Sequence, residues 1–220
     1  MIRRDYIMRM VEQFAKVASR ILRLEEDGQF EEALTVIDKS LNDFFGLNSH
    51  LVSSLSYKDL LLLLGGDLNP TKSLILADFL KEEGGIFDKK DEPDESCKRY
   101  LKSLNIFLSI LVKDEEIDIG EYLYKIGEIV DKLKKYRLPT ETKYKLFHYY
   151  EKVGKYSKAE ELLFELIEID HPENDIVEEG NSFYKRLMEK DDSELIDGDL
   201  PRDEVKEGLA RIREIKKKQA

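Results

Sequence analysis

Apolar residues recur at intervals of three and four along almost the whole chain, and this spacing restricts the fold more than any other feature. In the first 27 residues they fall at Ile7, Met10, Val11, Phe14, Val17, Ile21 and Leu24. Such a spacing places them on one face of an α-helix. No segment alternates apolar and polar residues over the length of a strand. The pattern predicts an all-α protein of about ten amphipathic helices.

The composition agrees with long, solvated helices. Charged residues make up 38% of the 220 residues, against about 25% in an average protein, and the chain has only 12 glycines and 5 prolines. A chain of this length can bury its own core as one large domain or two small ones. The formal net charge is −11, so the average surface would repel a phosphate backbone. We therefore expect no nucleic-acid partner.

The sequence also argues against a membrane protein and a disulfide framework. The longest apolar run, residues 60–64, is far shorter than the roughly 20 residues that span a bilayer. Charged residues interrupt the apolar positions near the N-terminus, which is not typical of a signal peptide. Cys97 is the single cysteine, so no intrachain disulfide can form. We expect a cytoplasmic protein without membrane contact.

Charged stretches containing glycine mark the expected connections. Residues 84–93 begin with two glycines and contain five charged residues, at 88–92, which predicts an exposed loop. We accordingly expect N-terminal helical hairpins in residues 1–83, a loop at 84–93 and C-terminal helical hairpins in residues 94–220, together forming one continuous domain. A second acidic stretch, residues 191–199, is expected to be a loop between the last two helices.

Two six-residue segments share a pattern of glycine, aromatic residue and alanine. They are residues 28–33, GQFEEA, and residues 154–159, GKYSKA. Glycine permits a left-handed exit from a helix, the aromatic residue packs at the start of the next helix, and alanine lets two helix backbones cross closely. A short connection also makes the two helices antiparallel neighbours. The residues expected to build these two turns are Gly28, Phe30, Ala33, Gly154, Tyr156 and Ala159.

These turns resemble those of the tetratricopeptide repeat. The matching positions are Leu24, Gly28, Phe30, Ala33 and Ile37 in the earlier segment, and Leu146, Tyr150, Gly154, Tyr156 and Ala159 in the later one, where Leu163 takes the place of the phenylalanine of the second helix. The chain departs from that family because it has no tryptophan, its two turn glycines are not separated by a multiple of about 34 residues, and Pro172 falls one residue late for the terminal proline. The resemblance implies antiparallel helix hairpins stacked as an irregular tetratricopeptide-like superhelix.

The opening sequence IRRDYIMRM, residues 2–10, is similar to the start of an uncharacterised bacterial family of tetratricopeptide-like proteins. That resemblance covers the whole chain. It implies a bacterial, cytoplasmic, helical protein and brings no known activity.

The residue patterns of catalytic and metal sites are missing from the sequence. The three histidines are far apart and form no His-Glu-x-x-His motif, which argues against zinc. The glycine pairs lack the spacing of a phosphate-binding loop. Aligning Gly198 with the glycine of a calcium loop would put Leu195 at a ligand position, where it cannot bind calcium. We expect no metal, no cofactor and no enzymatic activity.

A protein- or peptide-binding scaffold is the function that this architecture favours. Stacked helical pairs expose an extended concave surface that suits a peptide or a partner helix. The residues expected to line this groove are Tyr144, His148, Glu151 and Lys152, on the face of their helix that points away from its hairpin partner. They do not resemble the basic clamp that some such domains use for a terminal carboxylate.

Three other functions stay open at this point. The first is a sensor of a small molecule or signalling peptide, with a pocket inside the helical superhelix. The second is a structural homo-oligomer that uses the Leu60–Leu64 region or the N-terminal helix. The third, an enzyme, would need a polar, concave site with perturbed carboxylates.

Overall fold

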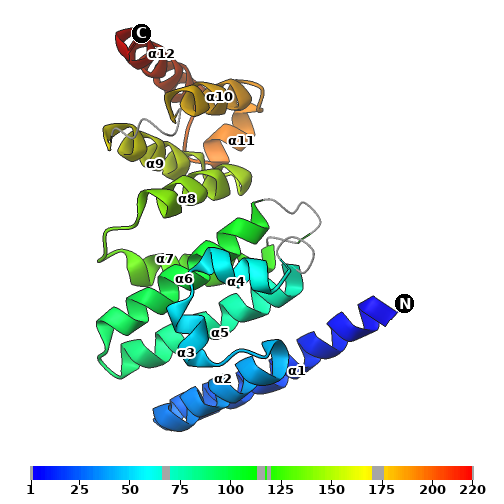
Figure 1. The fold of residues 1–220 in the computed structure, drawn as a ribbon. Coiled ribbons are helices and arrows are strands. Elements are labelled where there is room, and N and C mark those ends of the chain that lie inside the picture. The colour runs from blue at the N-terminus through cyan, green and yellow to red at the C-terminus, as the bar shows by residue number, and fades with distance from the viewer. Residues whose placement is uncertain (1, 66–69, 113–116, 118–119, 170–175, 220) are drawn as a thin grey trace. The chain divides into compact units, whose positions relative to one another are not determined.

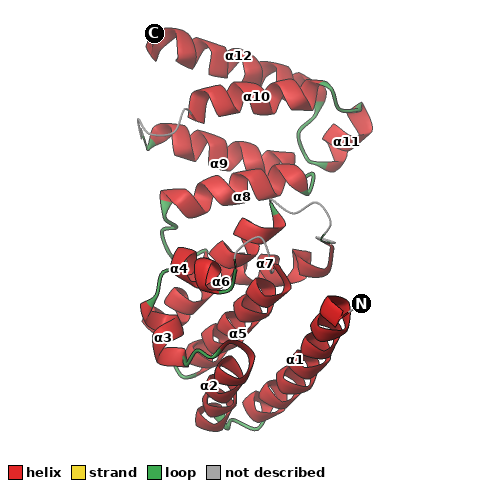
Figure 2. Cartoon of the chain, turned by 45° about the vertical axis from the view of Figure 1, so that its right-hand side comes forward, coloured by secondary structure: helices red, strands yellow, loops and turns green. Residues whose placement is uncertain are grey.

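The computed structural model describes residues 2–65, 70–112, 117, 120–169 and 176–219, with the side chains of residues 2–7, 121 and 218–219 left undescribed. Within these ranges the chain forms twelve α-helices and no strand (Figures 1 and 2). The all-α prediction is therefore confirmed for the described residues. The chain divides into two compact units, residues 1–137 and 138–220. Each unit is described by itself below.

The first unit contains seven helices. They are α1 (Ile2–Glu26), α2 (Phe30–Phe45), α3 (Ser49–Ser54), α4 (Tyr57–Leu63), α5 (Pro70–Lys89), α6 (Pro93–Leu111) and α7 (Gly120–Leu133). The most extensive packing is between α5 and α6; α1 and α2 pack on each other and on α5, and α7 packs on α6. Helices α3 and α4 are short, and α4 packs against α6.

An aromatic cluster joins the first three long helices of this unit. The Phe79 ring of α5 is fully buried, and three rings surround it. Its centroid lies 5.1 Å from that of Phe14 on α1, and 5.7 and 6.4 Å from those of Phe44 and Phe45 on α2. The apolar stripes predicted for these helices therefore meet in one core.

A lysine on α6 holds the end of α3. The Nζ atom of Lys102 donates hydrogen bonds to the backbone carbonyls of Val52, Ser53 and Leu55, at 2.7, 2.8 and 2.6 Å. These carbonyls belong to the C-terminal end of a helix, where no intrahelical donor is present. The ammonium group thereby fixes the short α3 segment to the longer helix.

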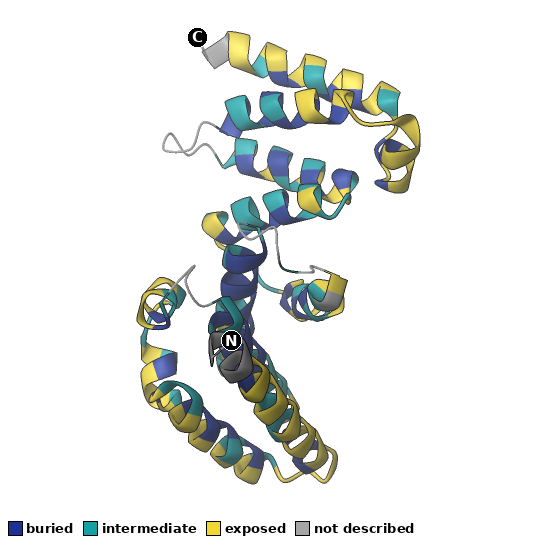
Figure 3. Cartoon of the chain, turned by 90° about the vertical axis from the view of Figure 1, so that its right-hand side faces the viewer, coloured by how far each residue is buried: buried dark blue, intermediate teal, exposed yellow. Residues whose placement is uncertain are grey.

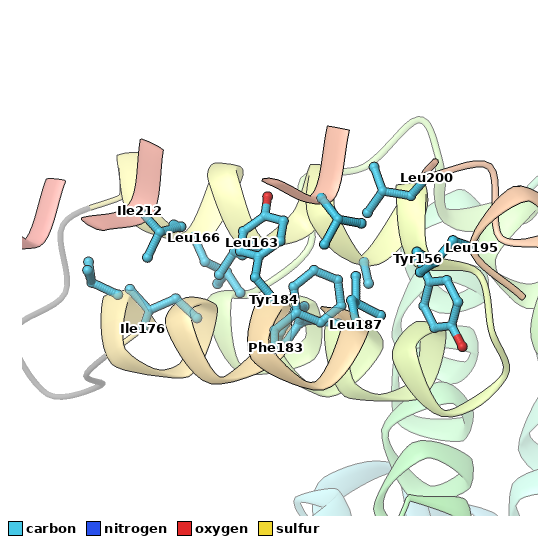
Figure 4. Close-up of a cluster of buried hydrophobic side chains, with 14 residues drawn as sticks. Tyr156, Leu163, Leu166, Ile176, Phe183, Tyr184, Leu187, Leu195, Leu200 and Ile212 are labelled. Atoms are coloured by element: carbon cyan, nitrogen blue, oxygen red, sulfur yellow. The ribbon is translucent and has the colours of Figure 1, made fainter. Parts of the chain in front are cut away.

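The second unit contains five helices. They are α8 (Thr140–Lys152), α9 (Tyr156–Glu168), α10 (Ile176–Met188), α11 (Asp192–Asp197) and α12 (Arg202–Gln219). Helix α8 pairs with α9, and α10 pairs with α12. Their buried sides form one core, drawn in Figure 4, around the fully buried Phe147, Phe183 and Tyr184. Figure 3 shows the exposed residues of these helices in yellow, and many of them are charged.

The predicted loop at residues 191–199 is wrong for its middle part, where α11 lies. Asp191 and Glu194 form a reciprocal capping box at the start of this helix. Leu195 is completely buried and holds the segment on the core. The acidic composition concealed a short helix with one apolar anchor.

The two turns predicted from the glycine pattern have the same backbone geometry. Gly28 and Gly154 both have φ = +72°. In each turn the glycine N–H donates to the carbonyl three residues earlier at 3.1 Å, and the next N–H donates to the carbonyl five residues earlier at 2.8 Å. This pair of bonds is the Schellman motif that ends many helices. Each turn connects two packed helices, α1 with α2 and α8 with α9, as predicted. Pro172 lies outside the described residues.

A third turn of this kind connects α5 and α6. Asp91 has φ = +59°, its N–H donates to the carbonyl three residues earlier, and the next N–H donates to the carbonyl five residues earlier. Sixty-three residues separate Gly28 from Asp91, and another 63 separate Asp91 from Gly154. Aspartate, Pro93 and Ser96 occupy the places of glycine, aromatic residue and alanine. These three turns, which join packed pairs of long helices, are therefore evenly spaced. Asp199, between α11 and α12, has the same pair of bonds and a φ of +56° but falls outside this spacing.

The loop predicted at residues 84–93 is wrong for residues 84–89, which belong to α5. Gly84 is buried, and a Cβ atom there would lie 3.0–3.1 Å from the Tyr100 ring of α6. The glycine is needed because two helices approach closely at this point, not because the chain bends. Only residues 90–92 form the connection.

Candidate functional site

The groove residues predicted on α8 lie along one part of its surface. The rings of Tyr144 and His148 are one helical turn apart, with centroids 4.6 Å apart and planes at 78°. The His148 ring also contacts Phe147, at 4.9 Å. Phe147 is fully buried and packs against Phe183 of α10, at 5.3 Å. The His148 imidazole is therefore half-buried, and it packs on a ring that is fixed in the core.

An arginine from α10 completes this surface. The Nε and Nη2 atoms of Arg186 donate to the two carboxylate oxygens of Glu151, at 2.6 and 2.9 Å. Nη2 also donates to Glu179, at 3.0 Å. Two carboxylates from two helices thus fix the plane of the guanidinium. We call this set the α8–α10 polar face; it consists of Tyr144, His148, Glu151, Glu179 and Arg186.

Burial and charge determine the protonation of this face. Burial lowers the pKa of His148, and Arg186 lowers it further, although Glu179 and Glu151 oppose the shift. Burial, with Glu179, raises the pKa of Tyr144. Both side chains are accordingly uncharged at neutral pH, so the imidazole offers one donor and one acceptor. Two carboxylates and one guanidinium leave an excess of one negative charge.

The structure brings three of the four predicted groove residues into this face. Lys152 is exposed at the C-terminal end of α8. Sequence reasoning missed Glu179 and Arg186. Their separation of seven residues is the spacing of one helix face, but which face of α10 meets α8 depends on packing between the helices.

A second concentration of charge lies in the first unit, between α5 and α7. Three ion pairs connect the helices: Asp78 with Lys125 at 2.6 Å, Lys81 with Glu128 at 2.9 Å, and Asp88 with Lys132 at 2.7 Å. We call these six residues the α5–α7 ion-pair ladder. These ion pairs hold α7 alongside α5.

Two further carboxylates lie near this ladder. Glu25 of α1 pairs with Lys89 at 2.7 Å, and its side chain is only 5% exposed. Its Oε1 atom has no hydrogen-bond partner among the described residues. Burial raises the pKa of Glu82, and Glu25 and Asp78 add to the shift while Lys81 opposes it. Burial also raises the pKa of Asp78 despite its pairing with Lys125.

The Tyr100 hydroxyl lies close to the same carboxylates. Its ring packs on Gly84, and the hydroxyl oxygen would be 3.5 Å from a Cβ atom placed at Gly85. Burial raises its pKa, and four carboxylates add to the shift: Asp88, Glu128, Glu82 and Glu25. The phenol therefore stays protonated. Among the residues with described coordinates, no three His, Cys, Asp or Glu side chains are arranged to hold a metal ion.

The sequence profile of DUF6483, a family of unknown function, matches residues 1–217. The chain belongs to this family. No curated protein and no solved structure shows significant similarity to it. The predicted membership of an uncharacterised family over the whole chain is thereby confirmed, while its tetratricopeptide character and bacterial origin stay predictions.

The charged clusters of this DUF6483 chain were missed because charged helical faces are usually solvated. Residues 78, 81 and 82 fall on a predicted helix and residues 88 and 89 in the predicted loop, and nothing in the pattern separates paired from unpaired charge there. In the described part of the chain, no helix is long and apolar enough to cross a membrane.

Proposed function

We propose that this DUF6483 protein is a peptide-binding scaffold of tetratricopeptide-like helical hairpins, and that it binds its peptide on the α8–α10 polar face. The proposal rests on one observation, the Arg186 guanidinium held by Glu151 and Glu179 beside Tyr144 and His148. An arginine already fixed in place loses little side-chain entropy when it binds a ligand. Its Nη1 group makes no hydrogen bond to any residue with described coordinates.

The chemistry of this face suits an extended peptide. A peptide backbone presents carbonyl acceptors and N–H donors in alternation. Arg186 Nη1 and the Tyr144 hydroxyl can donate to carbonyls, while neutral His148 can accept from an N–H group. The excess negative charge favours a peptide with a lysine or a free amino terminus over one with a terminal carboxylate.

The evenly spaced turns support the scaffold part of the proposal. The same Schellman geometry at Gly28, Asp91 and Gly154 makes successive helices antiparallel, as stacked helical hairpins require. As part of the same proposal, the protein works in the bacterial cytoplasm without a cofactor.

A peptide selection tests this function. Full-length protein is panned against a random peptide library displayed on phage, and the enriched peptides are titrated by fluorescence anisotropy. We expect Tyr144→Ala combined with His148→Ala to weaken binding at least tenfold. Arg186→Lys should also weaken it, because lysine keeps the charge but loses the planar fork.

A matched variant on α12 serves as the control. Lys206→Ala combined with Glu207→Ala changes two exposed residues of the same unit and should leave binding within a factor of two. If no peptide is enriched, or if the α8 double variant binds as the control does, the proposal is wrong.

The exposed leucines of α4 favour a second function, a structural homo-oligomer. Leu62 and Leu63 are 78% and 59% exposed, whereas Leu60 and Leu64 of the same run are buried. Adjacent exposed leucines are candidates for an interface between copies. Light scattering over a range of concentrations checks this, with Leu62→Ser and Leu63→Ser as the variant. A monomer at every concentration would exclude the oligomer.

A further inference from the structure

Helix α1 is basic, as α12 is, although the chain as a whole is acidic. It contains six basic residues, Arg3, Arg4, Arg9, Lys16, Arg20 and Arg23, and four acidic residues, Asp5, Glu12, Glu25 and Glu26. Its net charge is therefore +2, which leaves −13 for the other residues. A basic helix in an acidic protein is a local feature that the total charge conceals.

Three of these basic side chains surround a hollow on the surface of α1. The hollow has a volume of about 200 Å3 and is lined by Lys16, Ser19, Arg20, Arg23, Leu24 and Asp27. We call it the α1 cationic hollow. Its basic residues follow one another at intervals of four and three, so they share one helix face over roughly 10 Å. They are exposed, whereas Ile21 on the other side of the helix is fully buried; Figure 3 shows this exposed side of α1.

These cations are largely unneutralised. Arg20 pairs with Glu32 at 3.2 Å, and both side chains are more than half exposed. Lys16 and Arg23 have no carboxylate within ion-pair distance among the residues described by the structure. By contrast, all three lysines of the α5–α7 ion-pair ladder are paired. An exposed, flexible pair such as Arg20–Glu32 stabilises the protein little, so Arg20 can exchange its partner.

We propose that the α1 cationic hollow docks an acidic helix of a partner protein, with carboxylates three and four residues apart on one face. A helix places side chains with that spacing on one line, opposite the line formed by Lys16, Arg20 and Arg23. The proposal concerns a surface of the first unit and does not depend on the α8–α10 polar face.

The charges around the hollow favour this occupant over other anions. At physiological salt the screening length is about 8 Å, so a short acidic helix senses mainly the nearby cations. A long nucleic acid would also meet the acidic remainder of the chain. Asp27 lines the hollow and would repel a compact dianion such as phosphate, whereas a helix can place a basic or neutral residue opposite it.

Binding of a designed peptide to the full-length protein tests the proposal. The probe is a fluorescein-labelled, alanine-based helical peptide with three glutamates on one face, and its comparison has the same composition with the glutamates spread around the helix. We expect the one-face peptide to bind more tightly by fluorescence anisotropy at low salt. A tenfold increase in sodium chloride should weaken that binding several-fold.

Two triple variants separate the hollow from net charge. Lys16→Ala, Arg20→Ala and Arg23→Ala together should weaken binding of the one-face peptide at least tenfold. Lys134→Ala, Lys135→Ala and Arg137→Ala together remove the same charge from exposed positions in the first unit, and should leave binding within a factor of two. Far-ultraviolet circular dichroism checks the fold, and Lys16→Glu alone replaces the first triple variant if that variant is unfolded.

Four outcomes would overturn the proposal. Equal losses in the two triple variants would mean that only net charge matters. Equal affinity for the two peptides would exclude recognition of a helix face. Stronger competition by pyrophosphate or a DNA duplex would assign the hollow to a phosphate ligand. Salt-sensitive self-association that the hollow variant abolishes would identify a second copy of the chain as the occupant.

Discussion

Gly208 lets α12 lie directly against a buried tyrosine of α10. A Cβ atom at this position would overlap Cζ and Oη of Tyr184. Tyr184 is fully buried, and its hydroxyl donates a hydrogen bond to Glu160. The ring has little room to move, because the core of the second unit surrounds it (Figure 4). A glycine is needed here for the space it leaves, and its backbone freedom is incidental.

We expect Gly208→Ala to lower the free energy of unfolding by about 1–3 kcal/mol, because the added methyl group overpacks a closed site. Urea unfolding followed by circular dichroism measures the change. Gly127→Ala on α7 is the matched control, since nothing lies within 4 Å of a Cβ atom there. Alanine in an exposed helix interior should be neutral or stabilise by up to about 1 kcal/mol. Equal destabilisation by both substitutions would mean that Tyr184 does not restrict this position.

The three turns that join long helices share one backbone geometry, but the residue with the positive φ differs among them. Gly28 and Gly154 adopt a positive φ without strain, whereas Asp91 adopts a similar φ of +59° with a side chain present. A left-handed conformation raises the energy of most non-glycine residues by about 1–2 kcal/mol, and of aspartate by less. In the turn between α5 and α6, the left-handed backbone at position 91 would therefore favour glycine over the aspartate that is present.

Substitutions at two of these turns should have opposite effects. We expect Asp91→Gly to stabilise the protein by about 0.5 kcal/mol. Glycine relieves the cost of the left-handed conformation in the folded state, and its greater entropy in the unfolded chain offsets part of this gain. Gly154→Ala should destabilise by about 1 kcal/mol, although no side chain blocks the added Cβ. Urea denaturation midpoints measure both. If the two substitutions shift stability in the same direction, positive φ is not what distinguishes these positions.

The same turns show how far the sequence predicts the fold. Two are recognisable because glycine, an aromatic residue and alanine occupy them. The third is not, because Asp91, Pro93 and Ser96 stand at those positions although the N–H groups of Asp91 and Glu92 make the same pair of bonds. Residues 84–89 were assigned to a loop because a glycine pair usually breaks a helix. Only the Tyr100 ring from α6 explains why the helix continues, and such a tertiary contact leaves no local signal.

The α8–α10 polar face, too, is only partly predictable from the sequence. The spacing of α8 placed Tyr144, His148 and Glu151 on one surface. Arg186 could not be assigned to it, because the Phe147–Phe183 contact determines how α10 faces α8. Sequence periodicity gives the faces of each helix, while the pairing of faces is decided by the fit of buried side chains.

For the whole molecule, buried carboxylates determine how stability responds to pH. Burial raises the pKa of Asp78, Glu82, Glu83 and Glu160, even where a basic partner opposes it. Glu83, for example, is 2% exposed and pairs with Arg99 at 2.9 Å. The folded state thus binds protons more tightly at these four groups than the unfolded chain does. Their carboxylates favour unfolding when they ionise.

Several groups oppose this trend. Burial lowers the pKa of Lys102 to about 8, so this lysine adds stability as the pH rises towards 8. Hydrogen bonds from Lys98, Lys216 and Lys190 lower the pKa of Glu95, Glu178 and Glu194 respectively, but these pairs lie at the surface and are screened by solvent. Burial lowers the pKa of His148, which removes stability as the pH falls below its ordinary pKa of 6.5. The loss of stability from His148 begins in the same pH range in which the four buried carboxylates begin to gain protons.

We therefore expect the free energy of unfolding to be higher near pH 5.5 than near pH 8, by on the order of 1 kcal/mol. Above their ordinary pKa near 4.5, carboxyl groups with a raised pKa lose protons in the unfolded chain first, so stability falls as the pH rises through their folded pKa. The net charge of −11 acts in the same direction, because repulsion between carboxylates grows as they ionise. Urea unfolding at the two pH values measures the difference.

Glu160→Gln should reduce this difference in stability, since the amide oxygen can still accept a hydrogen bond from Tyr184 but the side chain no longer titrates. Glu161→Gln, at an exposed neighbouring position, should leave the difference unchanged. A protein that is more stable near pH 8 would show that its surface ion pairs outweigh the burial of these four carboxyl groups.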